Sequence, residues 1–271
     1  MAIPSGEAHD PIVSVEWLQR HIGDDQIRVI DVRPSDAYAA GHLPSAILTD
    51  LNALRMPDSS AATIERFTWL LTAELRRLGV RPGEWVIFYE DFSGALAPRG
   101  VWLLDLAGHG GGAMLDGGFS AWEAAGGPIE HRSVEPKPSD FTPELDLGRL
   151  ATADTLLRAI DGHGEVIPVD ARAVGEYVAG TIPGAIHVDW REHLQEDGTF
   201  RDLTELAALY GEAGLTPGTA AIVAPFCGSG FRAANSYVVL KALGFPSVAN
   251  YAPSWGEWGR RRDLPVAVPA R

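Results

Sequence analysis

Hydrophobic residues along the chain follow two alternating patterns. Short apolar runs, such as those within residues 28–31 and 85–89, predict buried β-strands. Between such runs, residues 15–22 and 153–160 carry an apolar residue at every third or fourth position, which predicts amphipathic helices. Strands that alternate with helices predict an α/β fold, in which each mainly parallel central sheet is flanked by helices on both faces.

The order of these elements occurs twice within the 271 residues. The sequence RVIDVRPSDAYAAGHLPSAI at 28–47 is echoed by VIPVDARAVGEYVAGTIPGAI at 166–186. Each copy ends a strand with an Asp-x-Arg motif, formed by Asp31 and Arg33 in the first copy and by Asp170 and Arg172 in the second. We therefore expect two domains built on one plan.

The boundary between the two domains is predicted from composition. Residues 131–149 are rich in proline and charge and lack an apolar period, which is typical of a linker. Thr152 is the expected N-cap residue of the helix that follows this segment. We therefore expect an N-terminal domain at 1–130, a linker at 131–149 and a C-terminal domain at 150–271.

Charge and length exclude several classes of partner. The formal charge is −14, and Lys137 and Lys241 are the only lysines, so the chain offers no basic field to nucleic acid. No apolar run is long enough to cross a membrane, and the N-terminus lacks the basic and apolar regions of an export signal. The single cysteine cannot form an internal disulfide. These features predict a cytoplasmic protein with neither nucleic-acid nor membrane partners.

That single cysteine, Cys227, lies in the segment IVAPFCGSGFRAANSY, between an expected strand and an expected helix. Taken alone, it is a small apolar residue that packs well in a core. However, Gly228 and Gly230 allow successive backbone amides to point inward as an anion-binding nest, next to the N-terminus of a helix beginning near Ala233. Arg232 adds a positive charge. A thiolate would be stabilised in this nest, so the sequence favours a nucleophile at the carboxyl end of a strand.

The tandem Asp-x-Arg motifs and the GHLPSA, TIPGA, CGSGFR and SWGEW segments resemble the two-domain rhodanese sulfurtransferases, over nearly the whole chain. The CGSG segment is similar to the loop of the 3-mercaptopyruvate branch. The resemblance implies tandem rhodanese-like domains and a persulfide on Cys227. Sulfane sulfur would pass from a small anionic donor, either thiosulfate or 3-mercaptopyruvate, to a thiophilic acceptor. The acceptor would be cyanide or a thiol, and the thiol could belong to a protein. No cofactor is expected. The loop that would hold the donor comprises Gly228, Ser229, Gly230, Phe231 and Arg232.

Other positions depart from the family or leave two roles open. Judged by its equal distance from the following helix stop, Asp91 stands in the first repeat where the second has Cys227, so the first domain is expected to be non-catalytic, as in two-domain members of the family. Ser229 replaces a lysine of the thiosulfate branch, and Glu176 replaces an arginine that holds the donor.

His42 is a candidate for a relay with Ser229, or a capping residue of a surface loop. Arg172 is a candidate donor ligand, although an arginine beside Asp170 more often braces its own loop.

Two rival functions and the absence of a metal site complete the sequence prediction. Cysteine phosphatases of the same fold place five residues between cysteine and arginine, whereas four residues separate Cys227 from Arg232 here, which makes a smaller loop. A non-enzymatic carrier that delivers a persulfide to a protein is a further alternative.

The eight histidines form no close pair and one cysteine cannot build a thiolate site, so no metal is expected.

Overall fold

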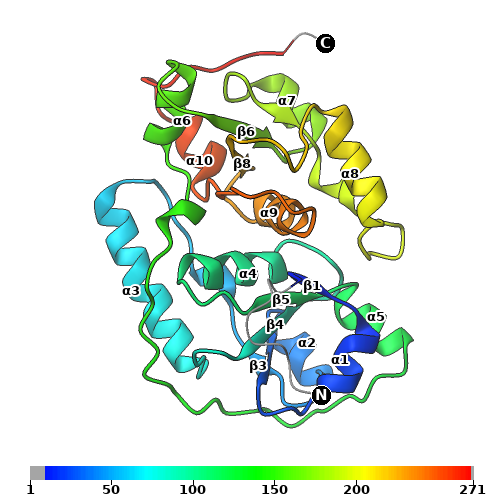
Figure 1. The fold of residues 1–271 in the computed structure, drawn as a ribbon. Helices are drawn as coiled ribbons and strands as arrows, with labels where there is room; N and C mark the ends of the chain where they lie inside the picture. Colours follow the sequence, from blue (N-terminus) through cyan, green and yellow to red (C-terminus); the bar gives the residue numbers. More distant parts are fainter. Residues whose placement is uncertain (1–9, 270–271) are drawn as a thin grey trace.

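The structure is a computed structural model that describes residues 10–269. The segment on which the expected absence of an export signal rests lies largely in residues 1–9, outside the described residues. Figure 1 shows two lobes, with helix α4 (Ala97–Leu106) of the first and helix α9 (Arg232–Ala242) of the second stacked at their junction. Within residues 10–269, no helix is both long and apolar enough to span a membrane.

The first lobe is a parallel five-stranded sheet in the order β1-β5-β4-β2-β3. Its strands are β1 (Ile12–Val13), β2 (Ile27–Asp31), β3 (Ile47–Leu48), β4 (Trp85–Tyr89) and β5 (Gly112–Leu115). Its helices are α1 (Val15–His21), α2 (Ser35–Ala40), α3 (Ala61–Arg77), α4 and α5 (Gly118–Ala124), with a 3-10 turn at Leu51–Ala53. Alternate β4 side chains point to opposite faces: Ile87 packs with α1, α2 and α5, whereas Phe88 packs with α3 and α4.

The second lobe repeats this plan. Strands β6 (Val166–Asp170), β7 (Ile186–His187) and β8 (Ile222–Phe226) pair in parallel in the order β7-β6-β8. Parallel bridges from Val223 to Val248 and from Leu150 to Asn250 extend the sheet in the order seen in the first lobe. The helices are α6 (Ala153–Ile160), α7 (Val174–Ala179), α8 (Leu203–Glu212), α9 and α10 (Ser254–Trp258), with 3-10 turns at Leu147–Arg149 and Trp190–His193. The predicted α/β architecture is confirmed in both lobes.

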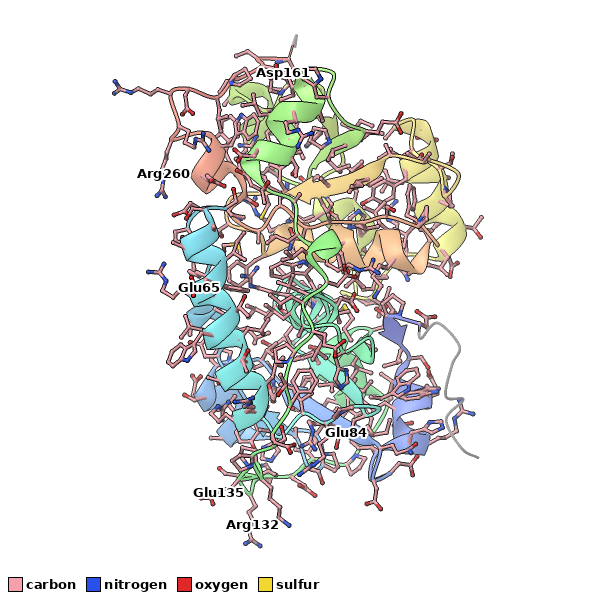
Figure 2. The ribbon with its side chains drawn as sticks, turned by 60° about the vertical axis from the view of Figure 1, so that its left-hand side comes forward. Glu65, Glu84, Arg132, Glu135, Asp161 and Arg260 are labelled. Carbon is pink, nitrogen blue, oxygen red and sulfur yellow. The ribbon has the colours of Figure 1, made fainter. Side chains whose placement is uncertain are left out.

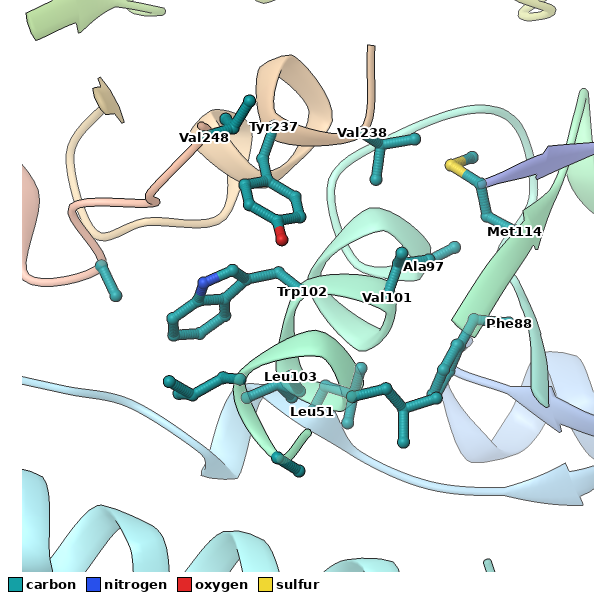
Figure 3. Close-up of a cluster of buried hydrophobic side chains, with 14 of the residues drawn as sticks. Leu51, Phe88, Ala97, Val101, Trp102, Leu103, Met114, Tyr237, Val238 and Val248 are labelled. Atoms are coloured by element: carbon teal, nitrogen blue, oxygen red, sulfur yellow. The ribbon is translucent and has the colours of Figure 1, made fainter. Parts of the chain in front are cut away.

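A shared apolar core joins the lobes. In Figure 3, Val101 and Trp102 of α4 face Tyr237 and Val238 of α9, and all four side chains are fully buried in one cluster. Polar contacts add to this packing, because the Tyr237 hydroxyl donates to Asp105 at 2.8 Å. Because α9 follows the loop of Cys227 directly, the junction also positions that loop.

The segment between the lobes is exposed over much of its length but fixed to the first lobe. Figure 2 shows its Arg132 and Glu135 at the edge of the molecule, from which the chain runs back along α3. Ser139 donates to the Val80 carbonyl at 2.6 Å, and Arg76 donates to the Phe141 carbonyl at 2.7 Å. The segment is therefore held by hydrogen bonds that its composition does not predict.

Candidate active site

Cys227 directly follows β8 and is 1% exposed. The Gly230 amide donates a hydrogen bond to the Cys227 sulfur at 3.2 Å. Gly230 has a φ of 79°, and a side chain there would place Cβ 2.4 Å from the Ala252 carbonyl oxygen. Glycine is therefore required for the turn that aims this amide at the sulfur, as the nest predicted from the sequence needs.

The loop of Cys227 is held from behind by the start of α10. The Cys227 amide donates to Ser254 Oγ at 3.0 Å, and the Trp255 amide donates to the Cys227 carbonyl at 2.9 Å. Ser254 is buried and has a φ of 57°, which is uncommon for a residue with a side chain. Sequence reasoning missed Ser254. The signal that could have found it is the repeat itself, because Ser254 occupies the position in the second Trp-containing turn that Gly118 occupies in the first.

Arg232 lies beside the loop but is already paired. It donates to both carboxylate oxygens of Glu176, at 2.6 and 3.0 Å, and its own side chain is 30% exposed. The pKa of Arg232 is raised, first by this hydrogen bond, against a smaller opposing effect of burial, and further by the negative charge of Cys227. Its guanidinium lies close to Gly228, where an added Cβ would be 3.1 Å from Nη2. Any donor anion must therefore compete with Glu176 for Arg232.

The other loop residues differ in exposure. Ser229 is exposed at the loop tip, whereas Phe231 is buried under the start of α9. The Arg55 guanidinium, which comes from the first lobe, lies 5.1 Å from the centre of the Phe231 ring. The first lobe therefore contributes directly to the surroundings of the loop.

Arg172 braces its own loop. It donates to both oxygens of Asp170, at 2.8 and 2.6 Å, and to the Gly180 carbonyl at 2.7 Å. Arg33 makes the same contacts with Asp31 and the Gly41 carbonyl. The bracing role expected for Arg172 is confirmed, with its Nε and Nη2 both engaged within its own loop.

His42 is not placed as the relay requires. Its side chain is fully buried and stacks on Tyr38, with 3.8 Å between the ring centres. Its Nδ1 lies 2.9 Å from the Tyr38 carbonyl, and its Nε2 lies 3.2 Å from the Arg132 carbonyl. Both ring nitrogens are thus engaged within the first lobe and its connecting segment, and neither reaches Ser229. The structure rules out the relay and corrects one part of the alternative: the histidine does cap the last turn of α2 at the Tyr38 carbonyl, but it is buried and not on an exposed loop.

Glu90, and not Asp91, is the structural equivalent of Cys227. The register pairs Asp31 with Tyr89 in the first lobe and Asp170 with Phe226 in the second, so the next residues correspond. The backbone agrees, because the Phe119 amide donates to the Glu90 carbonyl as that of Trp255 does to the Cys227 carbonyl. Counting back from the helix stops selected Asp91 because the segment from Glu90 to the stop at Gly108 is one residue longer than the segment from Cys227 to the stop at Gly244.

The Glu90 carboxylate occupies the loop of the first lobe. Its Oε1 accepts hydrogen bonds from the amides of Leu96 and Ala97, at 2.7 and 2.9 Å, at the start of α4. Burial nevertheless raises the pKa of Glu90 to about 7, against the lowering effect of these amides. A carboxylate cannot carry sulfane sulfur, so the first loop lacks a thiol like that of Cys227.

The loop of the first lobe also contacts the second lobe. Asn235 of α9 donates from Nδ2 to the carbonyls of Ser93 and Gly94, at 3.0 and 2.6 Å. Its Oδ1 lies 2.8 Å from Nδ1 of buried His193. In the described part of the chain, no group of three or more His, Cys, Asp or Glu side chains is arranged to hold a metal ion.

Comparison with known proteins places this geometry in a family. Residues 14–125 and 152–261 match the rhodanese-like domain. Thiosulfate sulfurtransferase of Azotobacter vinelandii is 30% identical over 259 residues, which cover 93% of this chain and 94% of that protein. Sulfur carrier protein TtuD of Thermus thermophilus is 31% identical and covers 97% and 98%. The crystal structure of SseA from Escherichia coli, a 3-mercaptopyruvate sulfotransferase, superposes with a TM-score of 0.75 at 27% identity, over 91% of this chain and 99% of that one.

Proposed function

The chain belongs to the rhodanese-like family and is a sulfurtransferase, and on this basis we propose that Cys227 carries the transferred sulfur as a persulfide. The observation that carries the proposal is the Gly230 amide, 3.2 Å from the Cys227 sulfur at the carboxyl end of a parallel sheet. Residues 150–271 would form the catalytic domain and residues 1–130 a non-catalytic one, joined by the linker at 131–149.

The first half-reaction loads the cysteine. The Cys227 thiolate attacks the outer sulfur of thiosulfate, a new S–S bond forms, and the old S–S bond breaks with its electron pair leaving on sulfite. With 3-mercaptopyruvate, the C–S bond breaks instead, and the carbon that loses sulfur takes the electron pair and a proton to give pyruvate. The Gly230 amide stabilises negative charge on the thiolate before the step.

The second half-reaction transfers the outer sulfur atom from the Cys227 persulfide to the acceptor. Cyanide or a thiolate attacks the outer sulfur of the persulfide, giving thiocyanate or a new persulfide, and the electron pair of the broken S–S bond returns to Cys227. No metal or organic cofactor takes part in either step. The proposed partners are thus a small anionic donor and a thiophilic acceptor. The free cysteine suits a reducing compartment, and we place the protein in the cytoplasm.

The likeness to TtuD favours a second candidate, in which Cys227 delivers its sulfur to one protein partner without turning over small substrates. Incubation with thiosulfate or 3-mercaptopyruvate, followed by intact mass and a thiocyanate assay with cyanide, separates the two. Repeated turnover that is lost in Cys227→Ala supports the enzyme, whereas loading by one sulfur atom without turnover supports the carrier. Loading by neither donor refutes both. A parallel assay with an aryl phosphate tests the phosphatase alternative, which requires that the protein hydrolyse this compound.

A further inference from the structure

Arg99, which belongs to α4 of the first lobe, is fully buried against the loop of Cys227. Its Nη1 donates to the Gly230 carbonyl at 3.3 Å, and its Nη2 donates to the Leu54 carbonyl at 2.6 Å. The guanidinium carbon lies 4.2 Å from the ring centre of Phe231 and 5.1 Å from that of Trp102. The side chain thus crosses from the non-catalytic lobe into the wall of the candidate active site.

This buried cation has no carboxylate partner among residues 10–269, where every ion pair involves another arginine or a lysine. Its Nε is buried and makes no hydrogen bond within that range. Burial of an unpaired charge is costly. Accordingly, burial lowers the pKa of Arg99 to about 9, while a negative charge on Cys227 acts in the opposite direction and Arg55 adds to the lowering.

The residue that Arg99 holds is the one whose amide reaches the sulfur. The Gly230 carbonyl accepts from Arg99 and from Asn250 Nδ2, at 3.3 and 3.1 Å, while the Gly230 amide donates to Cys227. Two donors from opposite lobes therefore fix the peptide that follows Gly230. Restraint of this kind keeps a catalytic hydrogen bond in place without reorganisation during the reaction.

We propose that Arg99 is a positioning residue for sulfur transfer, which the non-catalytic lobe supplies to the catalytic one. It fixes Gly230 so that the Gly230 amide points at the sulfur, and its buried charge balances the negative charge of the Cys227 thiolate and persulfide. The charged groups that face the sulfur are then Arg99 from the first lobe and Arg232 from the second, with Arg55 behind Phe231. The proposal rests on Cys227 as the sulfur carrier of the proposed function.

The test compares a charge effect with a purely structural one. Formation of the Cys227 thiolate is followed by its ultraviolet absorbance from pH 4 to pH 10, with Cys227→Ala as the baseline and no sulfur donor present. Arg99→Gln removes the charge but keeps a hydrogen-bond donor, and we expect the midpoint to rise by about one pH unit or more. Arg99→Lys keeps a cationic side chain, although burial lowers the pKa of a lysine as well, so its midpoint should lie between those of the wild type and Arg99→Gln. Its single ammonium cannot make both bonds at the same geometry, so its kcat should fall about tenfold at unchanged KM.

Tyr237→Phe is the matched control, because it removes an interlobe hydrogen bond to Asp105 without changing a charge near Cys227. Its midpoint should match that of the wild type. An unchanged midpoint in Arg99→Gln, or an equal rise in Tyr237→Phe, would overturn the proposal. If Arg99→Gln does not fold, Arg99→Lys decides, and an unchanged kcat refutes the positioning role. The thiolate measurement needs no turnover, so a wild type that transfers no sulfur would refute the proposed function separately.

Discussion

The carboxylate of Glu90 offers a test of how the first lobe is built. Glu90 lies in the loop where its counterpart would be Cys227, and its Oε1 accepts from two backbone amides at the start of α4. Burial raises the pKa of Glu90 from an ordinary 4.5 to about 7. The perturbation is Glu90→Gln, in which the amide oxygen can still accept both hydrogen bonds but the side chain does not titrate.

The sign of the effect follows from proton binding. Between pH 4.5 and pH 7 the folded protein holds a proton on Glu90 that the unfolded chain has lost, so the free energy of unfolding falls as the pH rises through this window. A tenfold difference in proton affinity between the folded and unfolded chain corresponds to about 1.4 kcal/mol, which gives about 3 kcal/mol as an upper bound. Glu90 is partly and not fully buried. We therefore expect Glu90→Gln to match the wild type near pH 4.5 and to be about 1–3 kcal/mol more stable at pH 8.

Urea unfolding at both pH values measures this difference, followed by tryptophan fluorescence and by circular dichroism to check that one transition is observed. Glu65→Gln is the control, because Glu65 is exposed on α3 (Figure 2) and should change stability equally at both pH values. A difference between Glu90→Gln and the wild type that is the same at pH 4.5 and pH 8 would refute the reasoning.

Three further predictions concern the loops and the interface. Asn235→Ala leaves two carbonyls and Nδ1 of buried His193 without their partner and should lower the free energy of unfolding by about 3 kcal/mol, whereas exposed Asn52→Ala should change urea unfolding little. Glu176→Gln should free Arg232 and lower the KM for thiosulfate several-fold in steady-state assays, and a higher KM would show that the pair itself holds the donor. Gly230→Ala should lose most of kcat, because Cβ would collide with a backbone carbonyl; wild-type kcat would show that the loop can shift.

Local signals in the sequence were sufficient where the interacting groups are neighbours in the chain. The Asp170 and Arg172 brace forms between residues two positions apart at the end of a strand, and the structure confirms it. The glycine required at 230 follows from a backbone angle within the loop itself. Helices and parallel strands followed equally from apolar periodicity, because burial of one face is decided residue by residue along each element.

Positions that depend on register were harder to predict. Glu90 and Asp91 are adjacent, and a one-residue difference in the combined length of loop and helix is enough to exchange them when positions are counted back from the end of the helix. The strand pairing of Asp31 with Tyr89 removes the ambiguity, because hydrogen bonds between strands are not affected by loop length. The relay predicted for His42 was wrong for a related reason. The GHLPSA motif is local, but one hydrogen-bond partner of His42 is the carbonyl of Arg132, far along the chain.

The sequence by itself determined the repeated α/β plan, the family resemblance and the cysteine loop with its glycines, since each is written in contiguous residues. The tertiary structure decided which groups of the first lobe reach that loop. Arg99 is an arginine in an apolar helix, and nothing near it in the sequence shows that its guanidinium binds the Gly230 carbonyl. That contact exists because α4 and α9 pack against each other, and the packing of two helices depends on the side chains of both.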